Sequence, residues 1–190
     1  MKTFKRFISQ IPLLILWLML SVLLWGFVFS RITETTPAKK ITLCVDAQTP
    51  KAVNLAVEME KSAPEGIRMV KVHPFTYAML SSDTLINADL FIVRASDMAQ
   101  YLDWFRPLPD SLASDPGCWE RDGTKWGVPA YSADSKQGIA ANCIEYEEED
   151  YYLVCGRKSL HFTDNENAVD NAAEDMARYL IDHYQQERSL

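Results

Sequence analysis

The longest apolar stretch of the chain, Ile11–Phe29, lies close to the N-terminus and contains no charged residue. As a helix with a rise of ~1.5 Å per residue it reaches roughly 28 Å, about the thickness of the hydrocarbon core of a bilayer. A helix that is apolar on every side is not expected on the surface of a soluble domain. The pattern therefore predicts a helix that contacts the lipid bilayer over residues 11–29.

This segment is either an uncleaved anchor or a signal peptide. The basic residues before it suit both alternatives: Lys2, Lys5 and Arg6. The apolar region of a signal peptide is usually about 7–15 residues long and ends in small residues, whereas this longer run ends in the bulky Phe29. We predict a signal-anchor helix that crosses the cell membrane once, with the N-terminus in the cytoplasm and the bulk of the chain outside.

After residue 40 the apolar positions predict strands and helices in alternation. Short runs rich in β-branched residues indicate strands, and apolar positions spaced by three and four residues indicate helices. The expected elements are a strand at Ile41–Asp46, a helix at Pro50–Ala63, a strand at Ile67–Val72, a short helix at Pro74–Ser82, a strand at Asp89–Val93 and a helix capped by Ser96. This order is typical of a parallel sheet covered by helices.

The second half of the domain is less regular. Prolines and glycines are concentrated in residues 106–131, which we predict to be a loop-rich segment over one end of the sheet. Two strands are expected at Gln137–Tyr146 and Tyr151–Cys155, joined by an acidic turn. Thr163–Glu166 has the spacing of a capping box, which predicts a long C-terminal helix with an apolar stripe that begins at Val169.

These patterns divide the chain into three parts. They are a cytoplasmic stub with the membrane helix (residues 1–31), a polar linker (residues 32–40) and one extracytoplasmic domain (residues 41–190). The predicted fold of this domain is α/β, with three layers around a mainly parallel sheet. About 150 residues suffice for one hydrophobic core but hardly for two.

Charge and cysteine content narrow the possible partners. The net charge is −7, which excludes the basic surface that nucleic acid requires. The spacing of the four cysteines does not match a zinc site, and we predict no cofactor and no metal. Cys143 and Cys155 lie symmetrically about the acidic turn, so a disulfide across a hairpin is one alternative, and buried thiols are the other.

Motifs for catalysis are absent from the sequence: it has no glycine-rich phosphate loop, no nucleophile elbow and no H-E-x-x-H. Asp46 and Asp97 are expected at the carboxyl ends of parallel strands, where open α/β sheets bind ligands. Because aspartates are common at such positions, we predict that the protein is not an enzyme. Aromatic side chains near the same edge either stack on a ligand or fill the core beneath the loop: Trp104, Trp119, Trp126 and Tyr131.

Several short phrases resemble, in their order, the extracellular solute-binding proteins of ABC importers. They are Ala88–Val93 with Ala95–Met98, Pro107–Pro109, Asp122–Tyr131, and Tyr151–Val154 leading into Lys158-Ser159. The resemblance covers most of residues 41–184 and implies a type 2 periplasmic-binding-protein-like fold. The chain departs from the family because the Gly127–Pro129 loop lies too close to Tyr151 for a second lobe, and because no lipid-attachment cysteine follows the apolar run.

The resemblance implies a membrane-anchored single lobe that binds a small solute such as a sugar, in association with an ABC importer. The side chains expected to bind the solute come mainly from strand ends: Asp46, Gln48, Ser96, Asp97 and Tyr131. The alternative is a membrane-tethered scaffold that has lost the ligand and binds a membrane or cell-surface protein. Solvent-exposed tryptophans and an exposed Tyr131 around a concavity would favour the first function, and their burial under the loop would favour the second.

Overall fold

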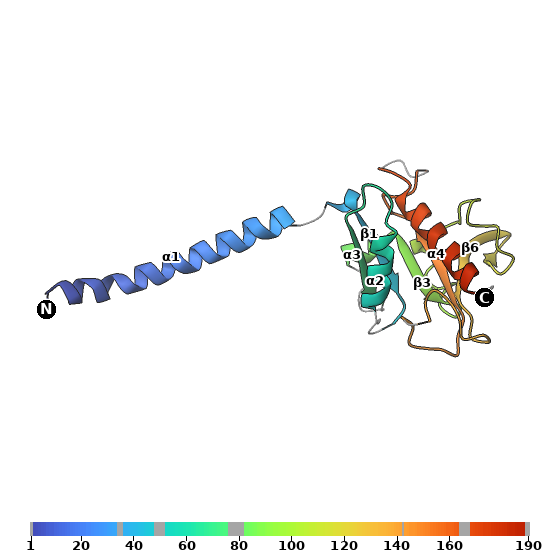
Figure 1. The fold of residues 1–190 in the computed structure, drawn as a ribbon, viewed down its shortest axis with the longest axis horizontal. Coiled ribbons are helices and arrows are strands. Elements are labelled where there is room, and N and C mark those ends of the chain that lie inside the picture. The colour runs from blue at the N-terminus through green and yellow to red at the C-terminus, as the bar shows by residue number, and fades with distance from the viewer. Residues whose placement is uncertain are drawn as a thin grey trace. The chain divides into compact units, whose positions relative to one another are not determined.

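The computed structural model describes residues 2–33, 36–47, 52–75, 82–141, 143–163 and 168–188. It divides the chain into two compact units, residues 1–35 and residues 36–190, which are drawn in Figure 1. The elements of the second unit are η1 (Pro37–Lys39), β1 (Lys40–Val45), α2 (Ala52–Lys61), β2 (Met69–Pro74), α3 (Asp83–Ile86), β3 (Leu90–Arg94), η3 (Leu102–Trp104), β4 (Phe105–Arg106), β5 (Trp119–Arg121), β6 (Thr124–Tyr131), β7 (Tyr151–Gly156) and α4 (Ala172–Arg188).

The first unit is a single helix, α1 (Lys2–Thr33). Its central part, Ile11–Phe29, is 19 residues long, has a mean hydropathy of 2.5 and buries none of its surface inside the protein. This helix is long and apolar enough to cross a membrane, a property that a membrane anchor and a signal sequence share.

The second unit is built on one open sheet with the strand order β2-β1-β3-β7-β6-β5, and β4 also pairs with β7. The pairs β1–β2 and β1–β3 are parallel, whereas every pair that involves β4, β5, β6 or β7 is antiparallel. The sheet is therefore mixed, and the prediction of a mainly parallel sheet is wrong. The prediction of an α/β fold is confirmed.

The antiparallel pairing of β5 with β6 follows from a tight turn at Asp122-Gly123. Both residues have positive φ, 54° and 75°, which is the conformation of a two-residue hairpin turn whose twist matches that of the flanking strands. The turn joins β5 to β6 in the antiparallel direction. The segment predicted to be a loop over the end of the sheet thus contributes two of its strands.

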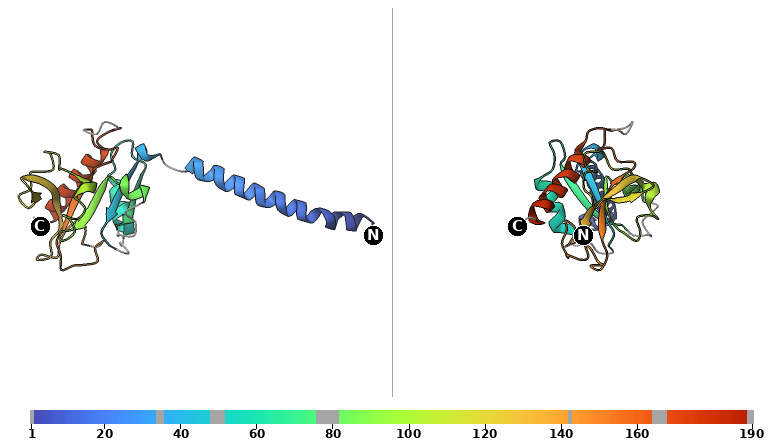
Figure 2. Two further views of the ribbon diagram at one scale, coloured as in Figure 1. Left: turned by 180° about the vertical axis from the view of Figure 1, so that it is seen from behind. Right: turned by 90° about the vertical axis from the view of Figure 1, so that its right-hand side faces the viewer.

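Apolar residues on the two faces of the sheet form two separate clusters. One face packs against α2 and α4 through residues such as Leu43 and Ile92. The opposite face packs against α3 and the aromatic side chains that follow β3, through residues such as Cys44 and Phe91. Figure 2 shows α2 and α4 on the same side of the sheet.

Three further local predictions differ from the structure. Residues 95–100 form turns rather than a helix capped by Ser96, and the Ser96 hydroxyl donates a hydrogen bond to Glu149. The described part of residues 137–146 consists of turns and one isolated bridge rather than a strand. Val169 is exposed and precedes α4, which begins at Ala172, while most of the predicted helix at Pro74–Ser82 and part of the capping box lie outside the described residues.

The four cysteines, all of them within the described part of the chain, form no disulfide. Three of them are buried, and burial raises the pKa of Cys44 and of Cys155 to about 12. These thiols behave as small apolar side chains, so the alternative of a Cys143–Cys155 disulfide is not realised.

Candidate functional site

The candidate site lies where the parallel strands end. β2 and β3 flank β1 on opposite sides, and α2 and α3, which connect these strands, cover opposite faces of the sheet. The carboxyl ends of β1 and β3 therefore form a topological switch point, the usual ligand position in an open α/β sheet. Asp46 follows β1 at this point, and Arg94 is the last residue of β3.

The centre of the site is the guanidinium group of Arg94. Its Nε donates a hydrogen bond to Oδ2 of Asp46 at 2.9 Å, and Nη2 donates to Oδ2 of Asp97 at 2.6 Å. Nη1 lies 3.9 Å from a carboxylate oxygen of Glu149. The two aspartates expected at neighbouring strand ends bond to the same arginine, which offsets their mutual repulsion.

The segment that precedes β7 completes this group of residues. The ring of Tyr146 lies 4.6 Å from the Arg94 guanidinium carbon in a cation–π contact. The hydroxyl of Ser96 donates a hydrogen bond of 2.6 Å to Glu149. We refer to Asp46, Arg94, Ser96, Asp97, Tyr146 and Glu149 as the carboxyl-edge cluster.

Burial and charge act in opposite directions inside the carboxyl-edge cluster. Burial raises the pKa of Asp46 above its ordinary value, although the hydrogen bonds from Arg94 oppose this shift. Burial alone would lower the pKa of Arg94, but the hydrogen bond and the negative charge of Asp46 outweigh burial and raise it. The Arg94 guanidinium therefore stays protonated and lies between the side chains of Asp46 and Asp97.

The remaining predicted site residues are placed differently. Tyr131 is 3% exposed, and its hydroxyl donates to the backbone carbonyl of Glu147 at 3.0 Å. Trp119 and Trp126 are partly buried and pack against the core cluster on the α3 face. Gln48 lies outside the described residues. The structure thus brings together Asp46, Ser96 and Asp97, but it holds Tyr131 inside the protein.

Sequence reasoning missed Arg94, Tyr146 and Glu149. Arg94 shares the period-2 face of Leu90 and Ile92, which point into the core on the α2 face, so its position in the strand was a usable signal. Glu149 was part of the acidic turn, and nothing in that run distinguishes the one carboxylate that reaches Arg94 from its neighbours.

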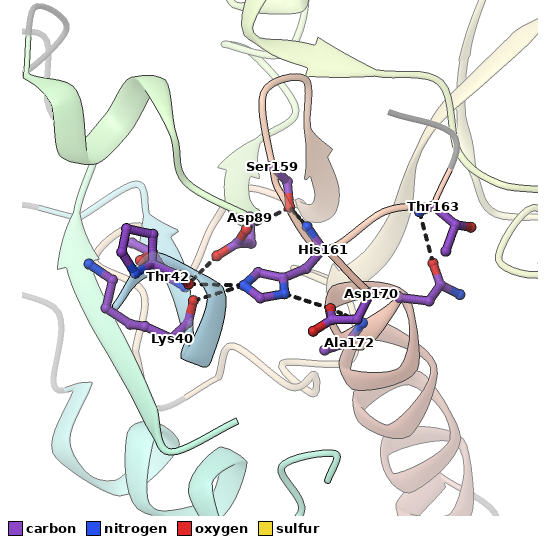
Figure 3. A network of polar contacts seen from close by, with 10 residues as sticks. Lys40, Thr42, Asp89, Ser159, His161, Thr163, Asp170 and Ala172 are labelled. Atoms are coloured by element: carbon purple, nitrogen blue, oxygen red, sulfur yellow. Dashed lines mark hydrogen bonds and ion pairs between the residues drawn. The ribbon is translucent and has the colours of Figure 1, made fainter. Parts of the chain in front are cut away.

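A second polar network lies at the opposite edge of the sheet, where β1 and β3 begin (Figure 3). Asp89 accepts hydrogen bonds from the Thr42 amide at 2.8 Å and from the Ser159 hydroxyl at 2.5 Å. Nδ1 of His161 lies 2.6 Å from Asp170. We refer to Thr42, Asp89, Ser159, His161 and Asp170 as the amino-edge network.

The amino-edge network contains a serine, a histidine and two aspartates, but it is not a catalytic triad. The Ser159 hydroxyl donates to Asp89 and accepts from the backbone N–H of His161, not from its ring. Both ring nitrogens of His161 face other acceptors, so the imidazole is not placed to take the proton of the Ser159 hydroxyl. Among the described residues, no group of three or more histidine, cysteine or acidic side chains is arranged to hold a metal ion.

The comparisons with known proteins add little to this geometry. No family model and no curated protein sequence matches the chain. Thiaminase I from Bacillus thiaminolyticus is similar to part of it, with a TM-score of 0.33 and 15% sequence identity over 54% of this chain and 34% of that chain. The match therefore spans about a third of that protein, and a superposition this loose carries no argument about fold or function.

Proposed function

We propose that this chain is a membrane-anchored interaction domain whose single lobe, outside the cell membrane, contacts another protein rather than enclosing a solute. The observation that carries this proposal is that the protein's own Arg94 side chain fills the switch point. Arg94 lies between Asp46 and Asp97, so the polar groups at the usual ligand position bond to one another. The burial of Tyr131 and the packing of Trp119 and Trp126 on the core also favour a scaffold.

The surface next to the switch point indicates the kind of partner. Four acidic side chains and Tyr146 are exposed in the segment before β7; the acidic residues are Glu145, Glu147, Glu148 and Asp150. A basic surface on another protein is complementary to this segment, and such charge complementarity accelerates association and selects the partner. Tyr146 supplies an aromatic contact of the kind enriched in protein interfaces.

Binding of a small solute, in association with an ABC importer, is the second candidate. It is favoured by the position of the carboxyl-edge cluster at the switch point and by the 24% exposure of the Arg94 side chain. A solute that binds there has to replace Arg94 between the carboxylates, which selects for a cationic group. One lobe alone provides half of the enclosure found in ordinary small-molecule pockets.

Photo-crosslinking in the native membrane tests the interaction function. A photoreactive residue at Glu148 is expected to give one discrete protein adduct, which disappears when Glu147 is changed to Lys. The same photoreactive residue at Glu65, an exposed position in the loop between α2 and β2, serves as the control and is expected to give none.

Thermal melts of the full chain in detergent test the solute function. A scaffold gives no shift with sugars, amino acids, peptides or polyamines, whereas a ligand at ~100 times its dissociation constant stabilises by about 2.7 kcal/mol. A reproducible shift with one class of solute, abolished by Asp97→Ala, would overturn the interaction function in favour of solute binding.

A further inference from the structure

We propose that His161 is a proton-dependent latch that holds η1 (Pro37–Lys39), the connecting segment directly before β1, against the domain. The ring of His161 lies between two parts of the chain that are distant in sequence. On one side Nδ1 contacts Asp170, just before α4, at 2.6 Å. On the other side Nε2 lies 3.2 Å from the carbonyl oxygens of Pro37 and Lys40 (Figure 3).

Both ring nitrogens of His161 face oxygen atoms, an arrangement that two N–H donors satisfy best. Carbonyl oxygens accept hydrogen bonds and cannot donate them, and an ionised carboxylate is also only an acceptor. A neutral imidazole carries one N–H, so either tautomer would leave a nitrogen lone pair facing an oxygen. The imidazolium form has an N–H on both ring nitrogens. It can therefore donate one hydrogen bond to Asp170 and another to the carbonyl oxygens of Pro37 and Lys40.

The charged groups around the ring favour the same form. Asp170 faces it from the N-terminal end of α4, and the carboxylate of Asp89 faces it from the start of β3, while Lys40 on β1 is the neighbouring cation. Burial would by itself lower the pKa of His161, but the hydrogen bond from its ring to Asp170 and the negative charge of Asp89 outweigh burial and raise it.

Solvent reaches the latch through a cavity of about 390 Å³, which is lined by His161 together with Pro37, Lys40, Thr42 and Asp89. His161 is only 1% exposed to bulk water, so this cavity provides a route for proton exchange. It also gives space for the released segment to move when the proton is lost.

Loss of the proton opens the latch on the side of Pro37. The carboxylate of Asp170 is a stronger acceptor than a carbonyl, so Nδ1 keeps its proton and Nε2 loses the second one. The Nε2 lone pair then faces the oxygens of Pro37 and Lys40 and repels them. η1 (Pro37–Lys39), which is otherwise fixed mainly by backbone contacts such as Arg68 N–H to the Lys39 carbonyl, loses its side-chain anchor.

The direction of the pH effect follows from the raised pKa of His161 in the folded protein. The stabilisation by the latch is complete below the ordinary histidine pKa of about 6.5 and is lost as the pH rises through the higher pKa of the folded state. The domain therefore holds the connecting segment firmly at mildly acidic pH and releases it at alkaline pH. This inference is independent of which partner the domain binds.

Nitrogen-15 NMR of the full chain in detergent micelles, with labelled histidine, tests the protonation state directly. At pH 6 both ring nitrogens of His161 are expected to carry protons, and the titration midpoint is expected to lie above that of His73, whose pKa burial and the charges of Lys71 and Lys40 lower. A neutral His161 ring at pH 6 would overturn the proposal. Because this measurement uses the unaltered protein, it does not depend on the folding of a variant.

Limited cleavage by trypsin after Lys39 tests whether η1 is released from the domain. An unstructured Lys-Lys peptide, cleaved under the same conditions, corrects for the pH dependence of trypsin itself. Between pH 6 and pH 8.5 the corrected rate is expected to rise several-fold in the unaltered chain. His161→Gln is expected to be cleaved rapidly at both pH values, and His73→Gln is expected to behave like the unaltered chain. If the rise persists in His161→Gln, the latch is not at His161.

Discussion

The two edges of the sheet hold polar groups of similar composition in different surroundings. The amino-edge network and the carboxyl-edge cluster each combine acidic side chains with one cationic side chain. At the amino edge Asp89 is 3% exposed and His161 is 1% exposed, and only the outer Asp170 side chain reaches 38%. At the carboxyl edge Asp46 is 11% exposed, while the side chains of Arg94 and Asp97 are 24% and 23% exposed.

This difference in exposure suggests that the amino-edge network stabilises the fold and that the carboxyl-edge cluster is available for recognition. A buried polar group that loses its partner cannot bond to water instead, so its loss costs the full desolvation penalty. A partly exposed group recovers much of its solvation. The amino-edge network should therefore control stability and the attachment of the connecting segment, whereas the carboxyl-edge cluster should tolerate change and remain available for recognition.

The largest effect is expected for Asp89→Ala. The change leaves the Thr42 amide and the Ser159 hydroxyl without their acceptor in a buried place, which should destabilise the domain by about 2–4 kcal/mol. In a domain of this size the melting temperature should fall by roughly 5–15 °C. Thermal melts of the full chain in detergent measure this, with Asp83→Ala, an exposed aspartate on α3, as the control. A loss no larger than that of the control would contradict the assignment of the amino-edge network as structural.

A smaller effect is expected for Arg94→Met, which removes the guanidinium but keeps an apolar chain of similar length. Asp46, with 11% side-chain exposure, loses its partner, and the partial exposure of Asp97 limits the total loss to about 1–2 kcal/mol. The melting temperature should recover partly at lower pH, since the unpaired Asp46 then takes up a proton. Arg68→Met, at an exposed site, is the matched control, and an equal loss in both variants would show that the cluster stabilises nothing.

The position of the carboxyl-edge cluster was largely predictable from the sequence, but the presence of Arg94 between its aspartates was not. Asp46 and Asp97 followed from strands that end at one edge of a parallel sheet. The occupation of the site by Arg94 depends on the direction of one side chain. The alternation of Leu90, Ile92 and Arg94 indicates that direction, yet sequence alone does not say whether an arginine at a strand end bends back over the edge.

The errors in the second half of the domain have two physical causes. Asp122-Gly123 is a strong signal for a β-hairpin. The segment was nevertheless predicted to be a loop, because prolines and glycines are frequent around this dipeptide. Tyr131 points inward because the pairing of β6 with β7 shifts between Pro129 and Tyr131. Such a bulge changes which residues face the core, and no periodic pattern in the sequence marks it.

The third effect concerns α4, which packs beside the amino-edge network. Burial would raise the pKa of Glu174, but hydrogen bonds from Ser111 and Asn171 and the charge of Arg178 outweigh it and lower the pKa. The resulting stabilisation is present above the ordinary glutamate pKa of about 4.5 and is lost as the pH falls through the lower folded value. Glu174→Gln should therefore destabilise the domain by about 1 kcal/mol at pH 7 and by much less near pH 3.

Melts of the full chain at both pH values measure this difference. Asp175→Asn, at the neighbouring and 51% exposed position, is the control and should change the melting temperature little at either pH. If the Glu174→Gln deficit were constant between pH 7 and pH 3, the stabilisation would come from the shape of the side chain and not from its charge. Together with the alkaline loss expected from His161, this acid loss gives the domain a stability maximum between the two titrations.

The smallest effect is expected for Glu149→Gln, at the outer side of the carboxyl-edge cluster. The Glu149 carboxylate is 37% exposed and lies 3.9 Å from Arg94, and surface ion pairs of this kind contribute about 0–1 kcal/mol. The amide oxygen of glutamine can still accept the hydrogen bond from Ser96. The melting temperature should therefore stay within about 2 °C of the unaltered chain, and Glu148→Gln, an exposed neighbour, should behave in the same way. A selective loss of several degrees in Glu149→Gln would place this carboxylate with the structural groups of the amino edge, and the contrast between the two edges would then not hold for Glu149.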